Sequence, residues 1–470
     1  MSLFEAAARG AADRPALVWE RGMLTYAGLR ARAGGFAQFL ARAGIQPGQR
    51  LALALPNAPS LAVALLGALA RGVTVAPVDP LLSGDERAAI LSDLKPALAV
   101  ERVESRVGEL AIEPPAAPAL VLYTSGSTGQ PKGAVLSHAA LAFADQSWAG
   151  AVMRLRPGDV VLATLPLSHS LGLNGALLAP LIAGATVVLL DRFSPTGALA
   201  AIARHRVTVF PGVATMFQRV LAAPEVASTD LSRLRLAVAG AAPCPWVVCE
   251  DWRKRTGVRI LRGYGMSELF RPISYLDGDE GDRPDAVGRA VPGVELRAVN
   301  DAGEDVRAGE TGELWIRSPG AMDGYLGAVE ESAAVLAGGW FRTGDLVSVS
   351  ADGYVRIVGR QRERILRGGH SVFPPEVEAV LLTHPAVAEA AVVGHAHAEL
   401  GEEVAGFVTL RAGHGVQAGE LVGWCRERLA IYKYPRTVTI LSEMPKSPTG
   451  KVLKARLARR STDPARPGTP

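Results

Sequence analysis

Residues 123–133 read YTSGSTGQPKG, a run of hydroxyl side chains and glycines that closes on Lys132 and Gly133. Glycines let the backbone wrap closely around a ligand, and hydroxyls, backbone N–H groups and an ammonium together are suited to holding phosphate. An apolar stretch, ALVLY at 119–123, comes directly before it. We therefore interpret the stretch as a phosphate-binding loop at the end of a buried strand.

Two other interpretations of this loop are disfavoured. A Walker A loop needs Gly-x-x-x-x-Gly-Lys followed by Ser or Thr, which holds Mg²⁺. Here Lys132 follows Pro131 and precedes Gly133, so that hydroxyl is missing and a motor or GTPase is not indicated. A flexible Ser/Gly linker is also disfavoured, because the sequence on both sides is strongly patterned.

The length and composition of the chain limit which classes of protein it can belong to. A chain of 470 residues is too long for one hydrophobic core, so two or more domains are expected. Its hydrophobic fraction of 49% and charged fraction of 20% are typical of a soluble globular protein. The net charge of +4 comes without a run of Lys and Arg, so no nucleic-acid partner is indicated. Three cysteines without metal-ligand spacing indicate neither a disulfide framework nor a zinc site.

Two further features bear on location. The first fifteen residues lack the apolar run of a signal peptide, and a reducing cytoplasm fits the cysteine usage. Residues 170–190 carry no charge and are long enough to span a bilayer, but Asn174, Pro180 and Gly184 interrupt them. We predict a buried helix over 174–184 and a buried strand over 185–190, and no transmembrane span.

The order of segments predicts an α/β protein. Amphipathic helical segments alternate with short aliphatic strands over most of the first two-thirds of the chain, which is typical of parallel sheets with helices on both faces. The helix-then-strand pairs are 24–44 and 50–55, 60–72 and 73–78, 198–206 and 207–212, and 247–257 and 258–265.

The sequence pattern changes from about residue 287. Short predicted strands there alternate with Gly- and Asp-rich turns, as in an antiparallel or barrel-like subdomain. A compact α+β unit follows Gly359. We predict a large N-terminal domain over 1–358, a hinge over 359–364 and a small mobile C-terminal domain over 365–460. The proline-rich tail at 461–470 is predicted to be disordered.

Four more stretches stand in order behind the phosphate loop: GYGMSE at 263–268, WFRTGD at 340–345, GRQRERILRGGHSVFPPEVE at 359–378 and PKSPTGK at 445–451. Together, at this spacing, they resemble the adenylate-forming superfamily of acyl-CoA synthetases, luciferases and the adenylation domains of peptide synthetases. The resemblance runs from about residue 10 to 458. One such motif is moderately specific, whereas five in register are very specific.

The resemblance implies an ATP site. Its loop would hold the β- and γ-phosphates, Tyr264 would stack on adenine before Gly265, and Ser267 would lie beside the α-phosphate. Asp345 would grip both ribose hydroxyls, with a further contact from Arg360. The implied loop residues are Thr124, Ser125, Gly126, Ser127, Thr128, Gly129 and Lys132, and Gly240, Ala241 and Ala242 would pass along the other face of the adenine.

The implied reaction has two halves. A carboxylate attacks the α-phosphate to give an acyl-adenylate and pyrophosphate, with Mg²⁺ bound by Glu268 and Lys451 bridging the two reacting anions. A thiol, that of CoA, then displaces AMP after the small domain reorients about Arg362, where relatives more often carry Asp or Lys. Gly368 and Gly369 would pass beside the pantetheine tunnel.

The acid is less well defined. The implied pocket comprises His169, at the carboxylate end, and Gly172, Val213, Gly240 and Met266, although Ser168 departs from the usual aromatic residue. No aspartate is evident here to pair an α-ammonium, so an amino acid is not indicated. Arg271 could meet a second carboxylate of a dicarboxylic acid, but pairing with a surface acid is favoured.

We therefore predict a cytoplasmic AMP-forming ligase, a monomer or homodimer, joining a medium- or long-chain fatty acid to CoA. The alternative is a stand-alone enzyme that passes an aryl or other adenylate to a carrier-protein thiol or another nucleophile. A nucleotide-binding module without catalysis is disfavoured because both Lys451 and Glu268 are present. The motifs alone do not separate a luciferase-like oxygenase from a ligase.

Overall fold

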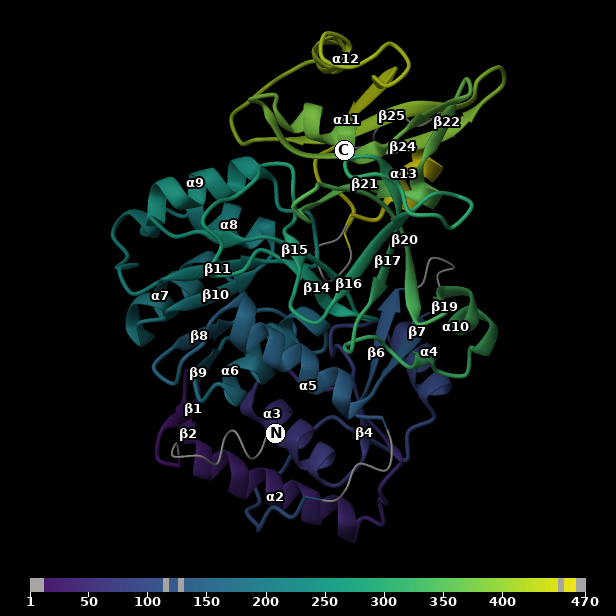
Figure 1. Ribbon diagram of the computed structural model, residues 1–470. Helices are drawn as coiled ribbons and strands as arrows, with labels where there is room; N and C mark the ends of the chain where they lie inside the picture. Colours follow the sequence, from purple (N-terminus) through teal and green to yellow (C-terminus); the bar gives the residue numbers. More distant parts are fainter. Residues whose placement is uncertain (1–11, 113–117, 126–130, 447–451, 462–470) are drawn as a thin grey trace. The chain divides into compact units, whose positions relative to one another are not determined.

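A computed structural model describes residues 12–112, 118–125, 131–446 and 452–461. The chain divides into two compact units, one of Met1–Leu296 with Ile316–Arg342 and the other of Arg297–Trp315 with Thr343–Pro470. The predicted hinge at 359–364 lies inside the second unit and stays a prediction. Figure 1 labels the helices and strands of both units.

The first unit contains a seven-stranded sheet in which every neighbouring pair is parallel except β1 and β2. Its order is β12 (Ile260–Leu261), β11 (Leu236–Ala239), β10 (Val209–Gly212), β8 (Val160–Ala163), β9 (Thr186–Leu189), β1 (Pro15–Trp19) and β2 (Gly22–Thr25). Helices α7 (Pro195–His205), α8 (Ala214–Leu221) and α9 (Trp246–Thr256) pack on one face of this sheet (Figure 1). Phe210, Phe217 and Trp252 form the aromatic centre of that core.

A second, six-stranded sheet of the first unit carries the phosphate loop. Its order is β18 (Gly324–Tyr325), β7 (Pro131–Leu136), β6 (Leu120–Ser125), β4 (Thr74–Pro77), β3 (Arg50–Leu53) and β5 (Leu98–Val100). Strands β3 to β6 are parallel, whereas β7 and β18 are antiparallel to their neighbours. Helix α4 (Gly84–Leu94) covers one face through Ile90 and Leu94. Helices α2 (Tyr26–Arg42) and α3 (Pro59–Ala70) lie against each other (Figure 1).

The uncharged segment at 170–190 folds as predicted. It forms a buried π-helix, η2 (Leu171–Leu178), and a short α6 (Ala179–Ile182), followed by strand β9. Within the described ranges of the chain, no helix has both the length and the apolar composition to cross a membrane. The helices α5 (His138–Ser147) and η1 (Trp148–Val152) pack beside η2.

A buried polar pair joins α5 to η2. The side-chain amide of Asn174 donates a hydrogen bond to the carboxyl group of Asp145, and both side chains are almost completely buried. Burial raises the pKa of Asp145 well above its usual value, against a smaller opposite effect of the Asn174 hydrogen bond. The folded protein therefore favours the neutral form of this carboxyl.

This pair predicts how stability depends on pH. Below the unfolded pKa, near 3.9, Asp145 is neutral in both states, and as pH rises the unfolded chain ionises first, so the folded state loses stability until its own pKa is passed. Asp145→Asn is expected to remove that loss and to raise stability at pH 8 by about 1–2 kcal/mol. Unfolding midpoints at pH 6, 7 and 8 test this, with the exposed Asp251→Asn as control. An unchanged pH slope would contradict it.

Two further sheets contain antiparallel pairs, and the larger of them lies in the region after residue 287, where antiparallel strands were predicted. A small sheet of the first unit has the order β13 (Gly263–Met266), β14 (Phe270–Ser274) and β15 (Arg289–Ala290). Another has the order β16 (Glu295–Val299), β17 (Thr311–Arg317), β20 (Trp340–Val349) and β19 (Leu336–Ala337), with β21 (Val355–Arg360) beside β20. The chain passes between the two units within β16, β17 and β20. Short helices are η3 (Pro224–Ala227), α10 (Val329–Val335) and η4 (Gln361–Glu363).

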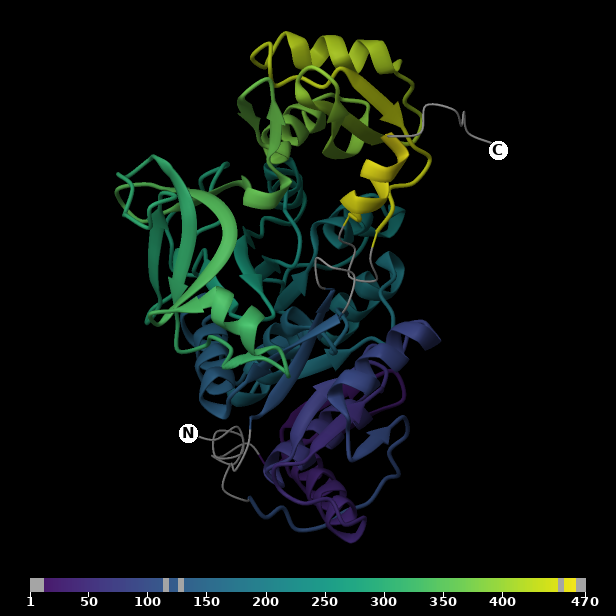
Figure 2. The same cartoon turned by 90° about the vertical axis from the view of Figure 1, so that its right-hand side faces the viewer.

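The C-terminal part of the second unit is the predicted α+β element. Its sheet has the order β23 (His370–Val372), β22 (Ile365–Arg367), β25 (Gly401–Leu410) and β24 (Val387–His397), with β26 (Thr437–Ile440) beside β25. Side chains alternate across β24, so that Val392 packs against α11 (Pro374–Leu382) and α12 (Ala418–Arg426), and Val393 packs against α13 (Lys454–Ser461). The sheet thus lies between two helical layers (Figure 2).

Candidate active site

The phosphate loop joins two antiparallel strands. Thr124 on β6 pairs with Lys132 on β7, and Ser125 pairs with Pro131, so the loop is the turn of a hairpin. A Walker A loop instead connects a strand to a helix, which explains why the Walker pattern fails here. The predicted residues Gly126, Ser127, Thr128 and Gly129 lie outside the described residues.

Tyr325 contacts both the predicted phosphate-binding residue Lys132 and the predicted magnesium ligand Glu268. The Nζ atom of Lys132 lies 5.5 Å from the centre of the Tyr325 ring, within cation–π range. The phenol hydroxyl of Tyr325 donates a 2.9 Å hydrogen bond to Oε1 of Glu268. Tyr325 reaches this place because β18 pairs with β7, opposite Ala134. Tyr325 was not predicted as a site residue, because its segment GYLG carries no recognisable ligand pattern.

The surroundings of Glu268 fit a magnesium ion that is shared with a nucleotide. Its carboxylate is partly exposed and is oriented by Tyr325, and a carboxylate oxygen is the hard ligand that Mg²⁺ prefers. Within the described ranges, no group of three or more His, Cys, Asp or Glu could form a cage for a metal by itself. Mg²⁺ characteristically takes one or two protein carboxylates and completes its shell with water and substrate phosphates.

The predicted adenine segments lie after β11 and on β13. Gly240, Ala241 and Ala242 directly follow β11, and Tyr264, Gly265 and Met266 form most of β13, with Ser267 in the turn that follows. Ala241 has a φ of +62°, a conformation that costs free energy for a residue with a side chain. Such strain tends to gather at binding sites, so this position agrees with a ligand-contacting role.

In the second unit the two predicted ribose residues contact each other. Asp345 on β20 faces Arg360 on β21, and the Nε of Arg360 lies 2.9 Å from Oδ1 of Asp345. The Asp345 side chain is only 4% exposed, whereas that of Arg360 is 32% exposed. The guanidinium thus holds the carboxylate in place, which suits a residue that must present two acceptor oxygens to a diol.

The predicted CoA, hinge and lysine positions also belong to the second unit. Gly368 and Gly369 have φ of +55° and +81° and form the two-residue turn between β22 and β23. This turn itself requires positive φ, so the glycines have a structural reason besides the predicted pantetheine contact. Arg362 lies in η4. Lys451 lies outside the described residues.

A polar cluster marks the predicted carboxylate end of the acid pocket. Nε2 of His169 lies 3.7 Å from Oδ2 of the buried Asp79, and this imidazole holds the pKa of Asp79 below its usual value, against the effect of burial. Among the described residues, no hydrogen-bond partner is found for the buried polar atoms Asp79 Oδ2, Ser168 Oγ and His169 Nε2. Asp79 Oδ2 and His169 Nε2 face each other at 3.7 Å, whereas the Ser168 hydroxyl has no such neighbour among the described residues, and a buried polar group of this kind agrees with a polar ligand. Asp79 was not predicted as a site residue from the sequence.

The other predicted pocket residues belong to the same unit. Gly172 lies in η2, where a side chain would meet the carbonyl oxygen of Pro166 at 2.3 Å, so close packing explains the glycine. Val213 is buried at the start of α8. Their contact with an acid stays a prediction.

The expectation that Arg271 pairs with a surface acid is wrong. Its side chain is buried, and its guanidinium donates to the carbonyl oxygens of Ala239 and Leu261, at 2.8 and 3.1 Å, and to the Ser274 hydroxyl at 3.0 Å. It also lies 4.9 Å from the centre of the Trp148 ring. Burial lowers the pKa of Arg271 to about 9. The sequence could not show this burial, since arginine is rarely buried.

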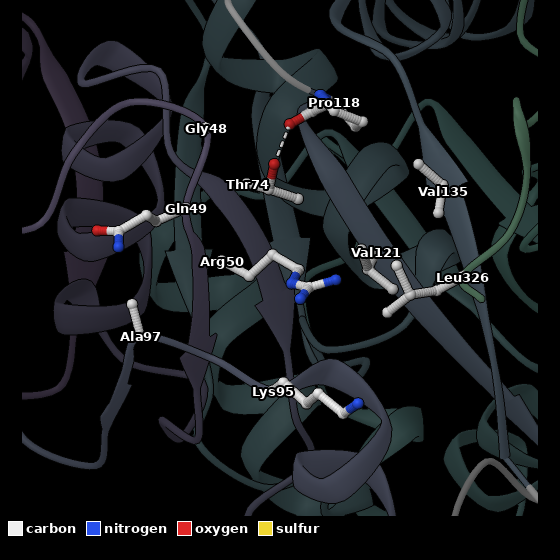
Figure 3. A pocket seen from close by; sticks show the side chains of 10 residues that line it. All are labelled: Gly48, Gln49, Arg50, Thr74, Lys95, Ala97, Pro118, Val121, Val135 and Leu326. Carbon is white, nitrogen blue, oxygen red and sulfur yellow. Dashed lines mark hydrogen bonds between the residues drawn. The ribbon is translucent and has the colours of Figure 1, made fainter.

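A cavity of about 520 Å³ lies elsewhere in the first unit (Figure 3). Its lining includes residues at the amino ends of parallel strands, such as Arg50 on β3 and Thr74 on β4, where the Thr74 hydroxyl donates to the carbonyl of Pro118 at 2.7 Å. The predicted adenine segment instead follows the carboxyl end of a strand, the usual place for a ligand in such sheets. This cavity is therefore not the predicted site.

Comparison with known proteins decides the family. The model of the AMP-binding enzyme family matches residues 4–113 and 107–326, and that of the AMP-binding enzyme C-terminal domain matches 376–451. The chain belongs to the AMP-binding enzyme family. The adenylate-forming resemblance and the predicted α/β fold with a separate small C-terminal domain are confirmed.

Curated and solved members of the family resemble this AMP-binding enzyme over nearly its whole length. A feruloyl-CoA synthase of Amycolatopsis sp is 35% identical, covering 93% of this chain and 94% of its own. A long-chain-fatty-acid–CoA ligase of Yersinia pestis is 30% identical, covering 97% and 93%. The crystal structure of ATP-bound MatB from Rhodopseudomonas palustris has a TM-score of 0.91 at 29% identity, covering 98% and 99%.

The predicted class of enzyme is thereby confirmed: this AMP-binding enzyme is an AMP-forming acid–CoA ligase that uses ATP, Mg²⁺ and CoA. The relatives named above act on different kinds of acid, so the family alone leaves the substrate open. The roles of the individual site residues stay predictions.

Proposed function

We propose that this enzyme joins a compact aromatic carboxylic acid to CoA, in preference to the medium- or long-chain fatty acid expected from the sequence. The observation that carries the proposal is the position of Arg271 behind Gly240, a predicted pocket residue. A Cβ atom at Gly240 would lie 3.1 Å from Nη1 of Arg271 and 3.2 Å from Leu171. The space behind Gly240 is filled, which favours a short, flat acid over a long chain.

Arg271 is also difficult to displace. A Cβ atom at Gly263 would lie 2.3 Å from its Cζ, so the guanidinium occupies the room that a side chain at 263 would take. Its three hydrogen bonds and the Trp148 ring fix it from several sides. Moving it to admit an alkyl chain would leave two buried carbonyl groups without donors, at a cost of roughly 1–3 kcal/mol each.

The polar cluster supplies the other end of such a pocket. The Ser168 hydroxyl and the His169 imidazole are suited to orienting the substrate carboxyl group and the acyl phosphate that forms from it, and Asp79 lies beside the imidazole as its counter-charge. Adenylation then forms a bond between the carboxylate oxygen and the α-phosphorus, and pyrophosphate leaves. In the second half, the CoA sulfur attacks the acyl carbon and AMP leaves. The resemblance to a feruloyl-CoA synthase also supports an aromatic acid.

A fatty acid remains the second candidate, because long-chain-fatty-acid–CoA ligases are about as similar to this chain and the predicted pocket residues Val213 and Met266 are apolar. Pyrophosphate release with ferulate, benzoate, phenylacetate, octanoate and palmitate separates the two candidates. We expect kcat/KM for the best aromatic acid to exceed that for octanoate by at least about tenfold. A preference for octanoate or palmitate would overturn the proposal.

The acceptor is tested in the same assay. When CoA is present, acyl-CoA and AMP are expected to form in equal amounts. Turnover with a carrier-protein thiol or another nucleophile, and none with CoA, would instead favour the stand-alone adenylating enzyme that the sequence left open.

Arg271 itself gives a further prediction. Arg271→Ala is expected to open the space behind Gly240 and to shift the ratio of kcat/KM values, octanoate over aromatic acid, by about tenfold toward octanoate. Because both values are measured on one variant, a loss of folded protein cancels in the ratio. Arg262→Ala is the matched control, since it removes another buried arginine that also donates to backbone carbonyls. An unchanged ratio in Arg271→Ala would show that Arg271 does not limit the pocket.

A further inference from the structure

Two of the three cysteines lie close together beside the predicted adenine segment. The sulfur atoms of Cys244 and Cys249 are 3.7 Å apart. Cys244 lies in the loop that follows β11, and Cys249 lies in the first turn of α9. Their spacing in the sequence gave no sign of pairing, because the approach depends on how the loop turns back onto the helix.

We propose that Cys244 and Cys249 form a peroxide-sensitive dithiol whose oxidation to a disulfide restrains the loop that contacts ATP. A disulfide needs a sulfur–sulfur distance of about 2.05 Å, so the two sulfur atoms, now 3.7 Å apart, must approach each other by about 1.7 Å. Cys244 is partly exposed, so a molecule as small as hydrogen peroxide can reach the pair. Cys249 is a buried residue of α9 and packs in the hydrophobic core, so it is the fixed member of the pair.

The surroundings favour a thiolate at Cys249. The hydrogen bond with Cys244 lowers the pKa of Cys249 and outweighs the opposite effect of burial, and the nearby Arg262 guanidinium lowers this pKa further, against a smaller opposite effect of Asp282. The first turn of a helix also favours negative charge. Arg262 is held in place over the Trp246 ring and by a 2.7 Å hydrogen bond to the carbonyl of Pro284.

The reaction balances with peroxide alone. The Cys249 thiolate attacks one peroxide oxygen and the O–O bond breaks, which gives a sulfenic acid and, after protonation, one water. The Cys244 sulfur then displaces hydroxide from the sulfenic sulfur, and its thiol proton makes a second water. Two thiols are oxidised to one disulfide while one hydrogen peroxide is reduced to two waters.

The consequence for ATP follows from the chain connectivity. Only Pro243 separates Cys244 from Ala242, and Gly240, Ala241 and Ala242 are the residues predicted to pass along the adenine. Pulling Cys244 toward α9 moves this segment, whose Ala241 already has a strained backbone. We expect the oxidised enzyme to have a KM for ATP about fivefold higher or more. The oxidation stands independently of the proposed function, whereas the effect on ATP depends on the family's ATP site.

The test uses the full chain and begins with the chemistry. Trypsin cleavage after Arg235 and Arg253 puts both cysteines in the single peptide 236–253. After treatment with hydrogen peroxide, this peptide is expected to be about 2 Da lighter, and dithiothreitol is expected to restore it. Titration of the unfolded protein should give one free thiol in place of three. A peptide that stays reduced, or a disulfide that includes Cys425, would overturn the proposal.

Cys425 is the internal control. It is completely buried in the second unit, where burial raises its pKa to about 11, so it is expected to stay a thiol under the same treatment. Cys425→Ser should keep the mass loss at 236–253, whereas Cys244→Ser should trap the sulfenic acid of Cys249 for reaction with dimedone. For activity, peroxide should raise the KM for ATP of the wild type, reversibly, and should leave Cys244→Ser unchanged. A disulfide that forms without any change in KM would refute the link to the ATP site.

Discussion

Lys451→Ala is expected to slow acyl-adenylate formation by about 10²–10³-fold, the usual cost of removing one group that stabilises charge in a transition state. Two anions, the substrate carboxylate and the α-phosphate, must approach each other, and a single ammonium between them relieves their repulsion as the new bond forms. The transfer of a supplied acyl-adenylate to CoA should change much less. Isotope exchange between pyrophosphate and ATP measures the first half, and acyl-CoA formation from the synthetic adenylate measures the second.

The neighbouring lysines provide matched controls. Lys446 forms an ion pair with Glu389, and Lys454 forms ion pairs with Glu363 at 3.1 Å and Glu378 at 2.8 Å, all within the second unit. Both ammonium groups are thus engaged by carboxylates of their own unit. Lys446→Ala is expected to leave pyrophosphate exchange within about threefold of the wild type. If Lys451→Ala kept normal exchange and lost CoA transfer instead, its predicted role in adenylation would be wrong.

The sequence predicted the fold well where local patterns determine it. Aliphatic runs such as β9 and β11 read as buried parallel strands, and the interruptions at Pro180 and Gly184 correctly separated a buried helix and strand from a membrane span. The five motifs identified the family because their order and spacing are far more specific than any one of them. These are properties of consecutive residues, which a single sequence records directly.

The sequence could not show contacts that depend on packing between distant segments. Tyr325 reaches Glu268 across 57 positions, and Asp79 faces His169 from a separate strand end. Arg271 is charged, which predicts an exposed side chain. Its guanidinium is nevertheless buried, because it donates hydrogen bonds to carbonyl groups at the ends of β11 and β12. In each case the partner is set by the sheet order, which brings together strands from different parts of the chain.

Glu268→Gln is the second large expected effect. Replacing the carboxylate by an amide removes the negative charge predicted to bind Mg²⁺ while keeping the shape of the side chain, and adenylation is expected to slow by about 10²–10³-fold. Tyr325→Phe removes only the hydrogen bond that orients Glu268, and a loss of about tenfold is expected, as for other residues that position a metal ligand. Pyrophosphate release measured over a range of Mg²⁺ concentrations tests both variants.

The dependence on Mg²⁺ separates a positioning role from a merely structural one. If Tyr325 holds the carboxylate in its binding orientation, Tyr325→Phe should need several-fold more Mg²⁺ for half-maximal rate and recover much of its activity at high Mg²⁺. Glu268→Gln should recover little, because its ligand atom is chemically changed. Tyr123→Phe is the matched control, since the Tyr123 hydroxyl donates at 2.7 Å to a different carboxylate, that of Asp93 on α4. It should leave the Mg²⁺ requirement unchanged, and a Tyr325→Phe profile equal to that of Tyr123→Phe would mean that Tyr325 does not position Glu268 for the metal.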